Sequence, residues 1–203
     1  NDNSSGAVAD IDGKATTDTS NANLEPLRMS SQWDVTGDAT LTYSFYDGDV
    51  AYASPYNGSS PTPGNPSPVS SHGATNEATL AAAFDAWDVT VDFEFSEVEE
   101  DAGEVGEIRV AFTDQSSGAA AFAYAPGNYA VNGDIWFETE DIDITGNDFS
   151  TDGVDSAGFN YYAALHEIGH ALGLSHPFDA GDDQSNGDDS LPLSKDSLRN
   201  TVM

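Results

Sequence analysis

Three histidines and one glutamate near the end of the sequence have a spacing that could bind a metal. They lie in the segment HEIGHALGLSH, residues 166 to 176. Residues four apart lie on the same face of an α-helix, so His166 and His170 can direct their rings at one point. Gly173 can take the left-handed conformation that ends a helix, and the resulting turn would bring His176 back to that point. The segment therefore predicts a site with three imidazole ligands.

Zinc is the metal that this ligand set favours. Neutral imidazoles suit zinc, with each nitrogen about 2.0 to 2.1 Å from the ion and the fourth position left to water. An open position is typical of a catalytic site. Glu167 follows the first histidine directly and is suited to accept a proton from zinc-bound water, whose pKa zinc lowers to about 7. The alternative is a closed zinc site that only joins helix to loop, and it leaves Glu167 without a role.

Two helices accompany the motif. Apolar residues at helical spacing predict a first helix from Thr75 to Trp87, with Thr75 or Asn76 as its N-cap. The motif itself lies on a last helix, predicted from about Gly158 to Leu172. The buried stripe of the last helix consists of Leu165, Ile168 and Leu172. The two helical histidines lie off this stripe, so they are free to face a site.

Short strands are predicted from alternating apolar and polar residues. A second clean alternation, after that of residues 39–45, covers residues 89–98 and places Val89 and Val91 on the apolar face. The predicted strands are residues 39–45, 89–98, 106–112, 119–125 and 134–138. Strands combined with one early and one late helix predict an α+β fold.

The composition indicates one domain with a strongly anionic surface. The chain has 203 residues, of which 38% are hydrophobic, and its formal net charge is -31. Nucleic acids and anionic membranes are therefore poor partners. Solubility is the preferred interpretation of the charge, with a cationic substrate or a calcium store as the alternative. The chain has no cysteine, which excludes a disulfide framework, and no apolar run approaches the roughly 18 residues of a membrane span.

Polar segments flank the predicted domain and interrupt it. Residues 1–23 show no apolar period and are predicted to be a flexible tail or arm, so the domain covers residues 24–203. Two acidic loops, Asp179 to Asp189 and Asp141 to Gly153, offer oxygen ligands for calcium. They lack the ligand spacing of an EF-hand. A solvated acidic loop is the preferred interpretation in both cases, and calcium is the alternative.

The string HEIGHALGLSHP resembles the extended zinc signature of the metzincin metallopeptidases. It is most similar to the serralysin branch of secreted bacterial proteases, and the order of strands and helices over residues 24–203 is similar too. The resemblance implies a twisted, mainly parallel sheet of about five strands with an antiparallel edge strand. Two long helices would pack on this sheet, and the second would carry the zinc motif.

The resemblance also implies roles for individual residues. His166, His170 and His176 would bind zinc, and Glu167 would be the general base. Met203, in NTVM, would be the methionine of the turn beneath the metal. The edge strand above the cleft would consist of Ala121, Phe122, Ala123 and Tyr124. An extended substrate would pair with this strand through backbone hydrogen bonds, and an ordinary sheet strand is the alternative.

The implied function is that of a secreted, extracellular zinc endopeptidase that hydrolyses peptide bonds of protein or peptide substrates. The sequence ends at Met203, whereas family members continue with a tyrosine and the lower part of the cleft. We expect that the remainder of a precursor is a separate chain or that the sequence is truncated. The rival functions are a non-catalytic zinc-binding extracellular module and a zinc hydrolase acting on a non-protein substrate.

Overall fold

The computed structural model describes residues 13–15, 27–35, 39–50, 52, 68–69, 73–101, 104–114, 119–139, 156–176 and 202–203. The two acidic loops proposed as calcium sites and most of residues 1–23 lie outside the described residues. No helix in the described part of the chain is long and apolar enough to cross a membrane.

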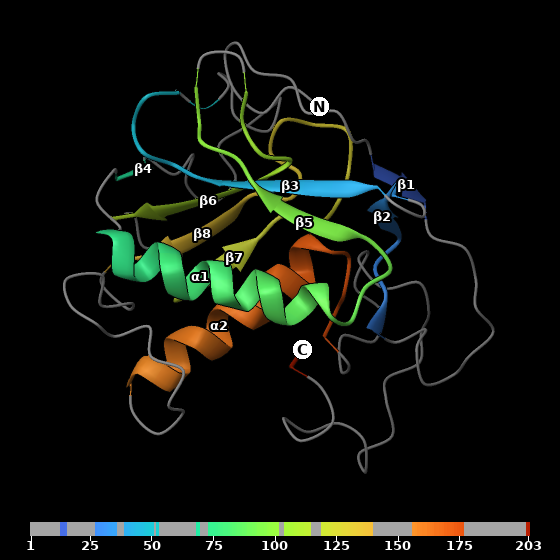
Figure 1. The fold of residues 1–203 in the computed structure, drawn as a ribbon. Coiled ribbons are helices and arrows are strands. Elements are labelled where there is room, and N and C mark those ends of the chain that lie inside the picture. Colours follow the sequence, from blue (N-terminus) through green and yellow to red (C-terminus); the bar gives the residue numbers. More distant parts are fainter. Residues whose placement is uncertain are drawn as a thin grey trace.

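A mainly parallel sheet forms the centre of the molecule (Figure 1). Its main strands are β3 (Thr40–Phe45), β5 (Glu94–Glu97), β6 (Ile108–Thr113), β7 (Ala121–Ala123) and β8 (Ile135–Glu138). They are ordered β5-β3-β6-β8-β7. Neighbours along β5, β3, β6 and β8 are parallel, and β7 runs antiparallel to β8 at the edge. The predicted sheet with an antiparallel edge strand is confirmed.

Three shorter strands were not predicted. β4 (Pro68–Val69) pairs antiparallel with β6, off the main path. β1 (Gly13–Ala15) pairs antiparallel with β2 (Ser31–Trp33) in a separate small sheet. Pairing of β1 with β2 attaches a part of the N-terminal segment to the domain. Two- and three-residue strands are too short to show a period of their own.

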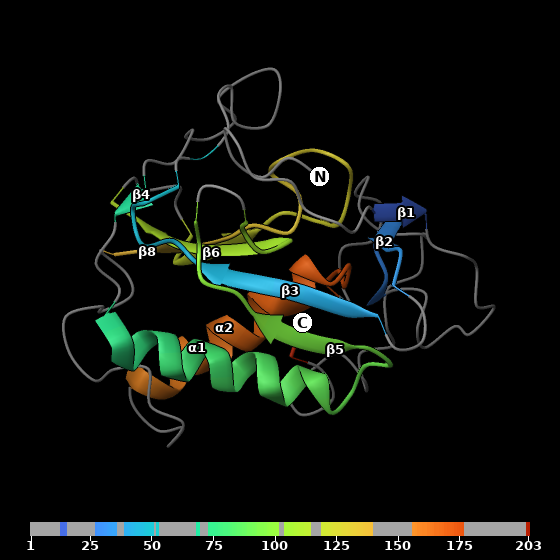
Figure 2. The same ribbon diagram turned by 45° about the horizontal axis from the view of Figure 1, so that its top comes forward.

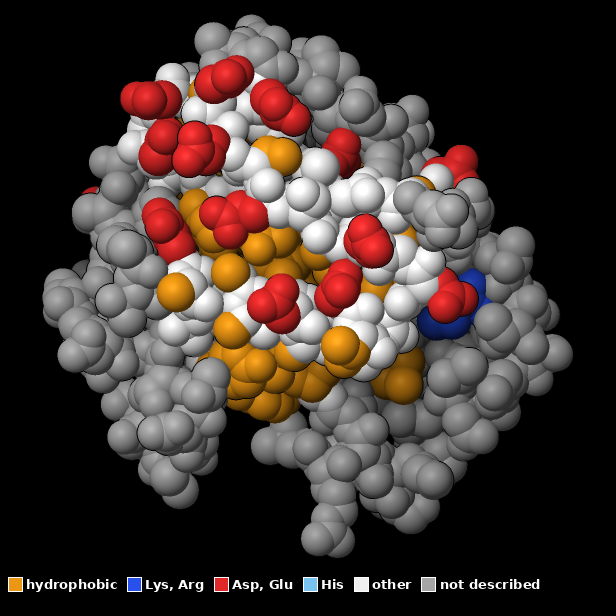
Figure 3. Space-filling model, viewed as in Figure 1, with side chains coloured by type: hydrophobic (Ala, Val, Ile, Leu, Met, Phe, Trp, Pro, Cys, Tyr) orange, Lys and Arg blue, Asp and Glu red, His pale blue; other side chains and the backbone are white. Residues whose placement is uncertain are grey.

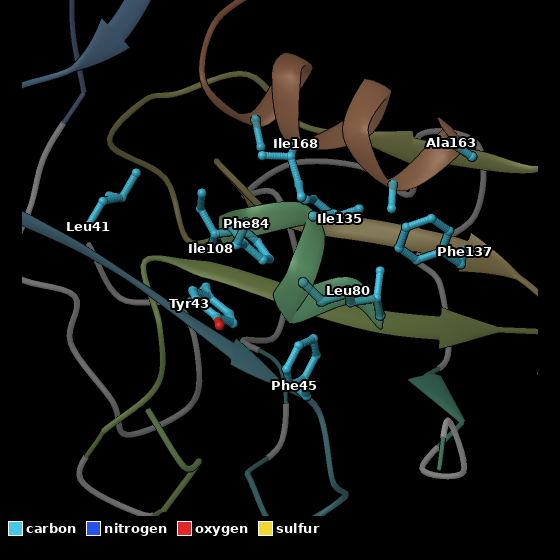
Figure 4. Close-up of a cluster of buried hydrophobic side chains, with 14 of the residues drawn as sticks. Leu41, Tyr43, Phe45, Leu80, Phe84, Ile108, Ile135, Phe137, Ala163 and Ile168 are labelled. Atoms are coloured by element: carbon cyan, nitrogen blue, oxygen red, sulfur yellow. The ribbon is translucent and has the colours of Figure 1, made fainter. Parts of the chain in front are cut away.

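Two helices of equal length cover one face of the sheet, as Figure 2 shows. They are α1 (Gly73–Asp88) and α2 (Ser156–Ala171), each of 16 residues. The main core lies between these helices and the sheet (Figure 4). Within it, the ring of Tyr43 from β3 stacks on Phe84 from α1, with ring centroids 4.0 Å apart. Burial of these apolar side chains fixes the position of α2, the helix with the histidine motif.

The opposite face of the sheet contains a buried ion pair. Arg109 of β6 is fully buried and donates from Nε to Glu100 Oε1 at 2.7 Å and from an Nη atom to the Val50 carbonyl at 2.9 Å. The guanidinium lies over the ring of Tyr52, 3.8 Å from its centroid. A charge buried away from water needs such partners. This network supports the central strand from the side away from the helices.

The structure corrects two details of the predicted elements. α1 begins at Gly73, so Thr75 and Asn76 lie within its first turn and are not its N-cap. The predicted strand 89–98 is formed only from Glu94 onward, and Val89 is 83% exposed. The reason is that α1 continues to Asp88 and is followed by a turn, so the apolar alternation begins before the strand does.

Acidic side chains are spread over the surface of the described residues. Figure 3 shows Asp and Glu side chains across the face that carries α1 and β5, with hydrophobic atoms between them. This distribution agrees with 36 acidic against five basic residues in the sequence.

Candidate metal centre and cleft

The Nε2 atoms of three histidines meet at one point beside α2. Each of the three distances, between His166 and His170, between His166 and His176 and between His170 and His176, is 3.1 Å. α2 supplies the first two side chains from successive turns, and the segment after the helix supplies the third. The structure therefore brings together the three side chains that the spacing predicted as ligands.

Hydrogen bonds at the far side of two rings determine which nitrogen carries the proton. Nδ1 of His166 lies 2.7 Å from the Val202 carbonyl oxygen, and Nδ1 of His170 lies 2.8 Å from the Leu174 carbonyl oxygen. A carbonyl oxygen only accepts, so both Nδ1 atoms donate and both Nε2 atoms are left with lone pairs. Burial lowers the pKa of His166, which also favours the neutral ring that a metal requires.

This donor set fits a zinc ion. Nitrogen lone pairs that converge repel one another unless a cation lies between them. Three nitrogens at mutual distances of 3.1 Å are close enough together to bind one zinc ion, for which imidazole Zn–N distances are about 2.0 to 2.1 Å. Carbonyl acceptors behind the ligating rings are the usual outer partners of zinc-bound histidines.

α2 ends in a Schellman motif, after which the chain turns toward the third histidine. The Gly173 N–H donates to the His170 carbonyl and the Leu174 N–H donates to the Gly169 carbonyl, both at 2.9 Å. Gly173 has a φ of 98°, in the left-handed region that glycine accepts readily. The reversal of direction at Gly173 is what places His176 near the other two rings.

A segment near the start of the domain packs on this turn. The Met29 N–H donates to the Gly173 carbonyl at 2.8 Å, and the Ser175 N–H donates to the Leu27 carbonyl at 3.0 Å. The Trp33 indole donates to the Ala171 carbonyl at 2.8 Å. These contacts were not predicted. The tryptophan and its acceptor are 138 positions apart, so no local pattern could have indicated them.

Glu167 lies beside the histidines with a carboxyl group that is shielded from water. The residue is 6% exposed, and its Oε2 has no hydrogen-bond partner among the residues that the structure describes. Burial raises the pKa of Glu167 to about 8. A buried carboxyl oxygen without a partner is costly unless another molecule meets it there. In this position it can exchange a proton with a molecule bound in the cleft.

A cleft of about 430 Å³ joins the histidines, Glu167 and the edge strand. Its wall on the strand side consists of Ala119, Ala121, Phe122 and Ala123. β7 is the last strand of the sheet, and Tyr124 follows it and donates its N–H to the Asp134 carbonyl at 3.0 Å. Three of the four predicted edge-strand residues thus line the cleft, and Tyr124 lies just beyond them.

Val202 and Met203 pack beneath the histidine site. Met203 is 5% exposed, and a Cβ added to Gly169 would lie only 2.5 Å from its Sδ. The Val202 carbonyl accepts a second hydrogen bond, from the Tyr162 hydroxyl at 2.8 Å. Tyr162 was not predicted as a site residue, although its position four residues before His166 places it on the same helix face.

Comparison with known proteins identifies the family. The matrixin peptidase family, Peptidase_M10, matches residues 65–182, more than half of the chain. A serralysin from Photorhabdus laumondii is 31% identical over 160 residues, which are 76% of this chain and 32% of that protein. The metallopeptidase AprA of Pseudomonas marginalis is 33% identical over 111 residues, 52% of this chain and 21% of that protein.

Human matrix metalloproteinase-25 is 30% identical over 113 residues, 50% of this chain and 19% of that protein. The match to the solved structure of myroilysin covers 70% of this chain and 52% of that chain at 18% identity, with a TM-score of 0.39. The chain spans about a third or less of the length of these curated relatives. The chain belongs to the matrixin peptidase family, within the metzincins, and its similarity is to serralysins as well as to matrix metalloproteinases.

Proposed function

We propose that this chain is the catalytic domain of a secreted zinc endopeptidase, with His166, His170 and His176 as zinc ligands and Glu167 as general base. The observation that carries the proposal is the convergence of three Nε2 atoms at 3.1 Å beside a buried carboxyl group. Family membership supports both zinc and peptide-bond hydrolysis. The serralysin similarity supports secretion.

The chain's own residues divide the chemistry between them. Zinc, when bound, supplies a Lewis acid that polarises a carbonyl group and makes water a stronger acid. Ionised Glu167, the form that a nearby cation would favour, accepts a proton from the attacking water and returns it to the leaving amine nitrogen. No side chain among the described residues is hydrogen-bonded to the buried Oε2 of Glu167, so none has to move before this oxygen can take the proton. Met203 packs beneath the site and keeps Val202 in place, whose carbonyl orients His166.

The substrate is proposed to be an extended segment of a protein. β7 pairs only with β8 within the described sheet, so its outer edge has backbone groups that an added strand could use. The side chains of Ala121 and Ala123 are small and leave room for a chain to approach. Phe122 and Tyr124 would flank that chain. The rival interpretation is that residues 121–124 are an ordinary edge strand, and measurement of substrate binding distinguishes the two.

The division into an arm, residues 1–23, and a domain, residues 24–203, stays a proposal, as does calcium binding by the acidic loops. A C-terminal remainder of the same precursor as a separate partner chain also stays a prediction.

The test is hydrolysis of a quenched fluorescent protein substrate before and after chelation, with zinc added back. Glu167→Gln should lower kcat by about 10² to 10⁴-fold, the usual contribution of a general base, while zinc still binds at one ion per chain. Glu99→Gln, at an exposed glutamate distant in sequence from the motif, is the matched control and should retain full activity.

Two results would contradict the proposal. Full activity of Glu167→Gln would remove Glu167 from the mechanism. Stoichiometric zinc with no turnover of any protein or peptide would favour a zinc-binding module instead of an enzyme.

A further inference from the structure

The last turn of α2 depends on a tryptophan from a distant part of the chain. Carbonyl groups in the last turn of a helix have no partner within the helix. The Schellman motif satisfies those of Gly169 and His170. The next carbonyl, that of Ala171, accepts from the Trp33 indole at 2.8 Å, in a bond that is buried from solvent. Trp33 therefore completes the helix end from which the chain turns to His176.

The ring of the same tryptophan also contacts Gly133, which lies between β7 and β8. A Cβ added to Gly133 would meet Trp33 Cζ2 at 2.6 Å and Cη2 at 3.0 Å, so the ring lies directly on the glycine backbone. The Gly133 N–H donates to the Tyr124 carbonyl at 3.1 Å, just after β7. Trp33 is thus in contact with both the end of α2 and the hairpin that contains the edge strand.

The residues before Trp33 continue this connection along the turn. Arg28 forms an isolated antiparallel bridge with Leu174, and the two flanking hydrogen bonds join Met29 to Gly173 and Ser175 to Leu27. The Leu174 carbonyl within this bridge accepts the hydrogen bond from His170 Nδ1 at 2.8 Å. The orientation of a proposed zinc ligand therefore depends on a backbone group that is held by residues 27–29.

We propose that Trp33 is a positioning residue for the zinc site: it fixes the turn that carries His176 and sets the separation of this turn from the edge strand. Trp33 itself does not touch the metal. Its indole N–H donates to the Ala171 carbonyl at the end of α2, and its six-membered ring contacts Gly133. This inference rests on the proposed zinc site. The competing interpretation is that Trp33, which is 3% exposed, contributes only to the core.

Replacement of the indole by a ring without an N–H separates these interpretations. Trp33→Phe keeps an aromatic ring and leaves the buried Ala171 carbonyl without its donor. The matched control is Trp87→Phe, because the Trp87 indole donates to the Leu165 carbonyl at 3.0 Å on the same helix. That acceptor lies in the helix interior, where the backbone already supplies a donor, and not at the turn.

The readouts are the zinc dissociation constant, measured by competition with a chromophoric chelator, and the visible spectrum of the Co²⁺-substituted protein. Loss of a group that supports metal ligands lowers metal affinity by about 10 to 100-fold. We expect Trp33→Phe to raise the zinc Kd about tenfold and to change the Co²⁺ spectrum. Trp87→Phe should leave the spectrum unchanged. A Trp33→Phe protein with a lower Tm but unaltered Kd and spectrum would overturn the inference.

A measurement on the unaltered chain covers the case in which Trp33→Phe does not fold. Coupling is reciprocal, so if Trp33 favours the zinc-binding geometry, zinc must in turn favour the Trp33 hydrogen bond. Solvent exchange of the Trp33 indole proton, followed by NMR, should slow when zinc is added, and that of Trp136 on the opposite face should not. Equal rates with and without zinc would overturn the inference alone. A chain that binds neither Zn²⁺ nor Co²⁺ would overturn the proposed function as well.

Discussion

The two helices have the same length and cover the same face of the sheet, but the hydrogen-bond partners at their C-terminal ends come from different distances along the chain. α1 ends with partners that are close in sequence. The Thr90 N–H and hydroxyl both donate to the Trp87 carbonyl at 2.8 Å, and Asp88 Oδ1 accepts from the Phe95 N–H at 2.9 Å. α2 ends with a local Schellman motif and with Trp33, a donor 138 positions away.

This difference indicates that α1 mainly affects the stability of the fold and that the end of α2 mainly affects metal binding. α1 contributes packing to the core, and its end can form as soon as its neighbours in the chain are present. The end of α2 carries the histidines and is complete only when residues 27–33 are in their final position. We therefore expect substitutions in α1 to change the free energy of unfolding and substitutions near the end of α2 to change metal binding.

The largest expected effect within this comparison is that of Leu80→Ala in α1. Leu80 is 1% exposed, and deletion of a buried leucine side chain lowers the free energy of unfolding by about 2 to 5 kcal/mol. Urea denaturation measures this loss. Folded Leu80→Ala protein should bind zinc with the Kd of the unaltered chain. A weaker zinc affinity in the folded variant would show that α1 also controls the site and would remove the distinction between the helices.

A substitution near the end of α2 should raise the zinc Kd and change the free energy of unfolding only slightly. In Gly169→Ala the new Cβ would lie 2.5 Å from Met203 Sδ and 3.3 Å from Trp87 Cζ2. The Met203 side chain must move, and we expect this shift to reach Val202 and to disturb its hydrogen bond from His166. Alanine also favours a helix over glycine by about 1 kcal/mol, so the net change in stability should be small. We expect a zinc Kd raised about tenfold, measured by chelator competition.

The double variant Gly169→Ala/Met203→Ala is the control for this prediction. If contact with the Met203 side chain causes the effect, its removal should reduce the penalty of Gly169→Ala. An equal penalty in both backgrounds would mean that the contact is not the cause.

The smallest expected effect is that of Asp88→Ala at the end of α1. The substitution removes the acceptor of the Phe95 N–H, a loss of about 0.5 to 1.5 kcal/mol for an ordinary hydrogen bond, measured by thermal or urea unfolding. Peptidase activity at 25 °C should not change. Asp85→Ala, at an exposed position of the same helix, is the matched control and should have a smaller effect on stability. A loss of activity in Asp88→Ala would contradict the purely structural role of this helix end.

The sequence predicts those features whose determinants are close together in the chain. His166 and His170 face one point because they are four residues apart on one helix. The turn at Gly173 was predicted because glycine commonly ends helices. Five strands and two helices were predicted for the same reason, with errors at boundaries such as Val89, where an apolar residue continues the pattern beyond the strand. The contacts of Trp33 could not be predicted, because nothing near residue 33 or residue 171 indicates the other. The shielding of Glu167 likewise depends on tertiary packing.

The buried pair of Arg109 and Glu100 has a consequence for the response of this protein to ionic strength. Of the five basic residues in the chain, one is enclosed beneath the sheet and cannot offset acidic charge at the surface. Dissolved ions screen interactions between exposed charges over distances beyond about 10 Å at 0.1 M, whereas a pair without solvent contact is scarcely screened. A saline medium should therefore reduce the repulsion among the surface carboxylates while the Arg109–Glu100 pair, which has no solvent contact, keeps its attraction.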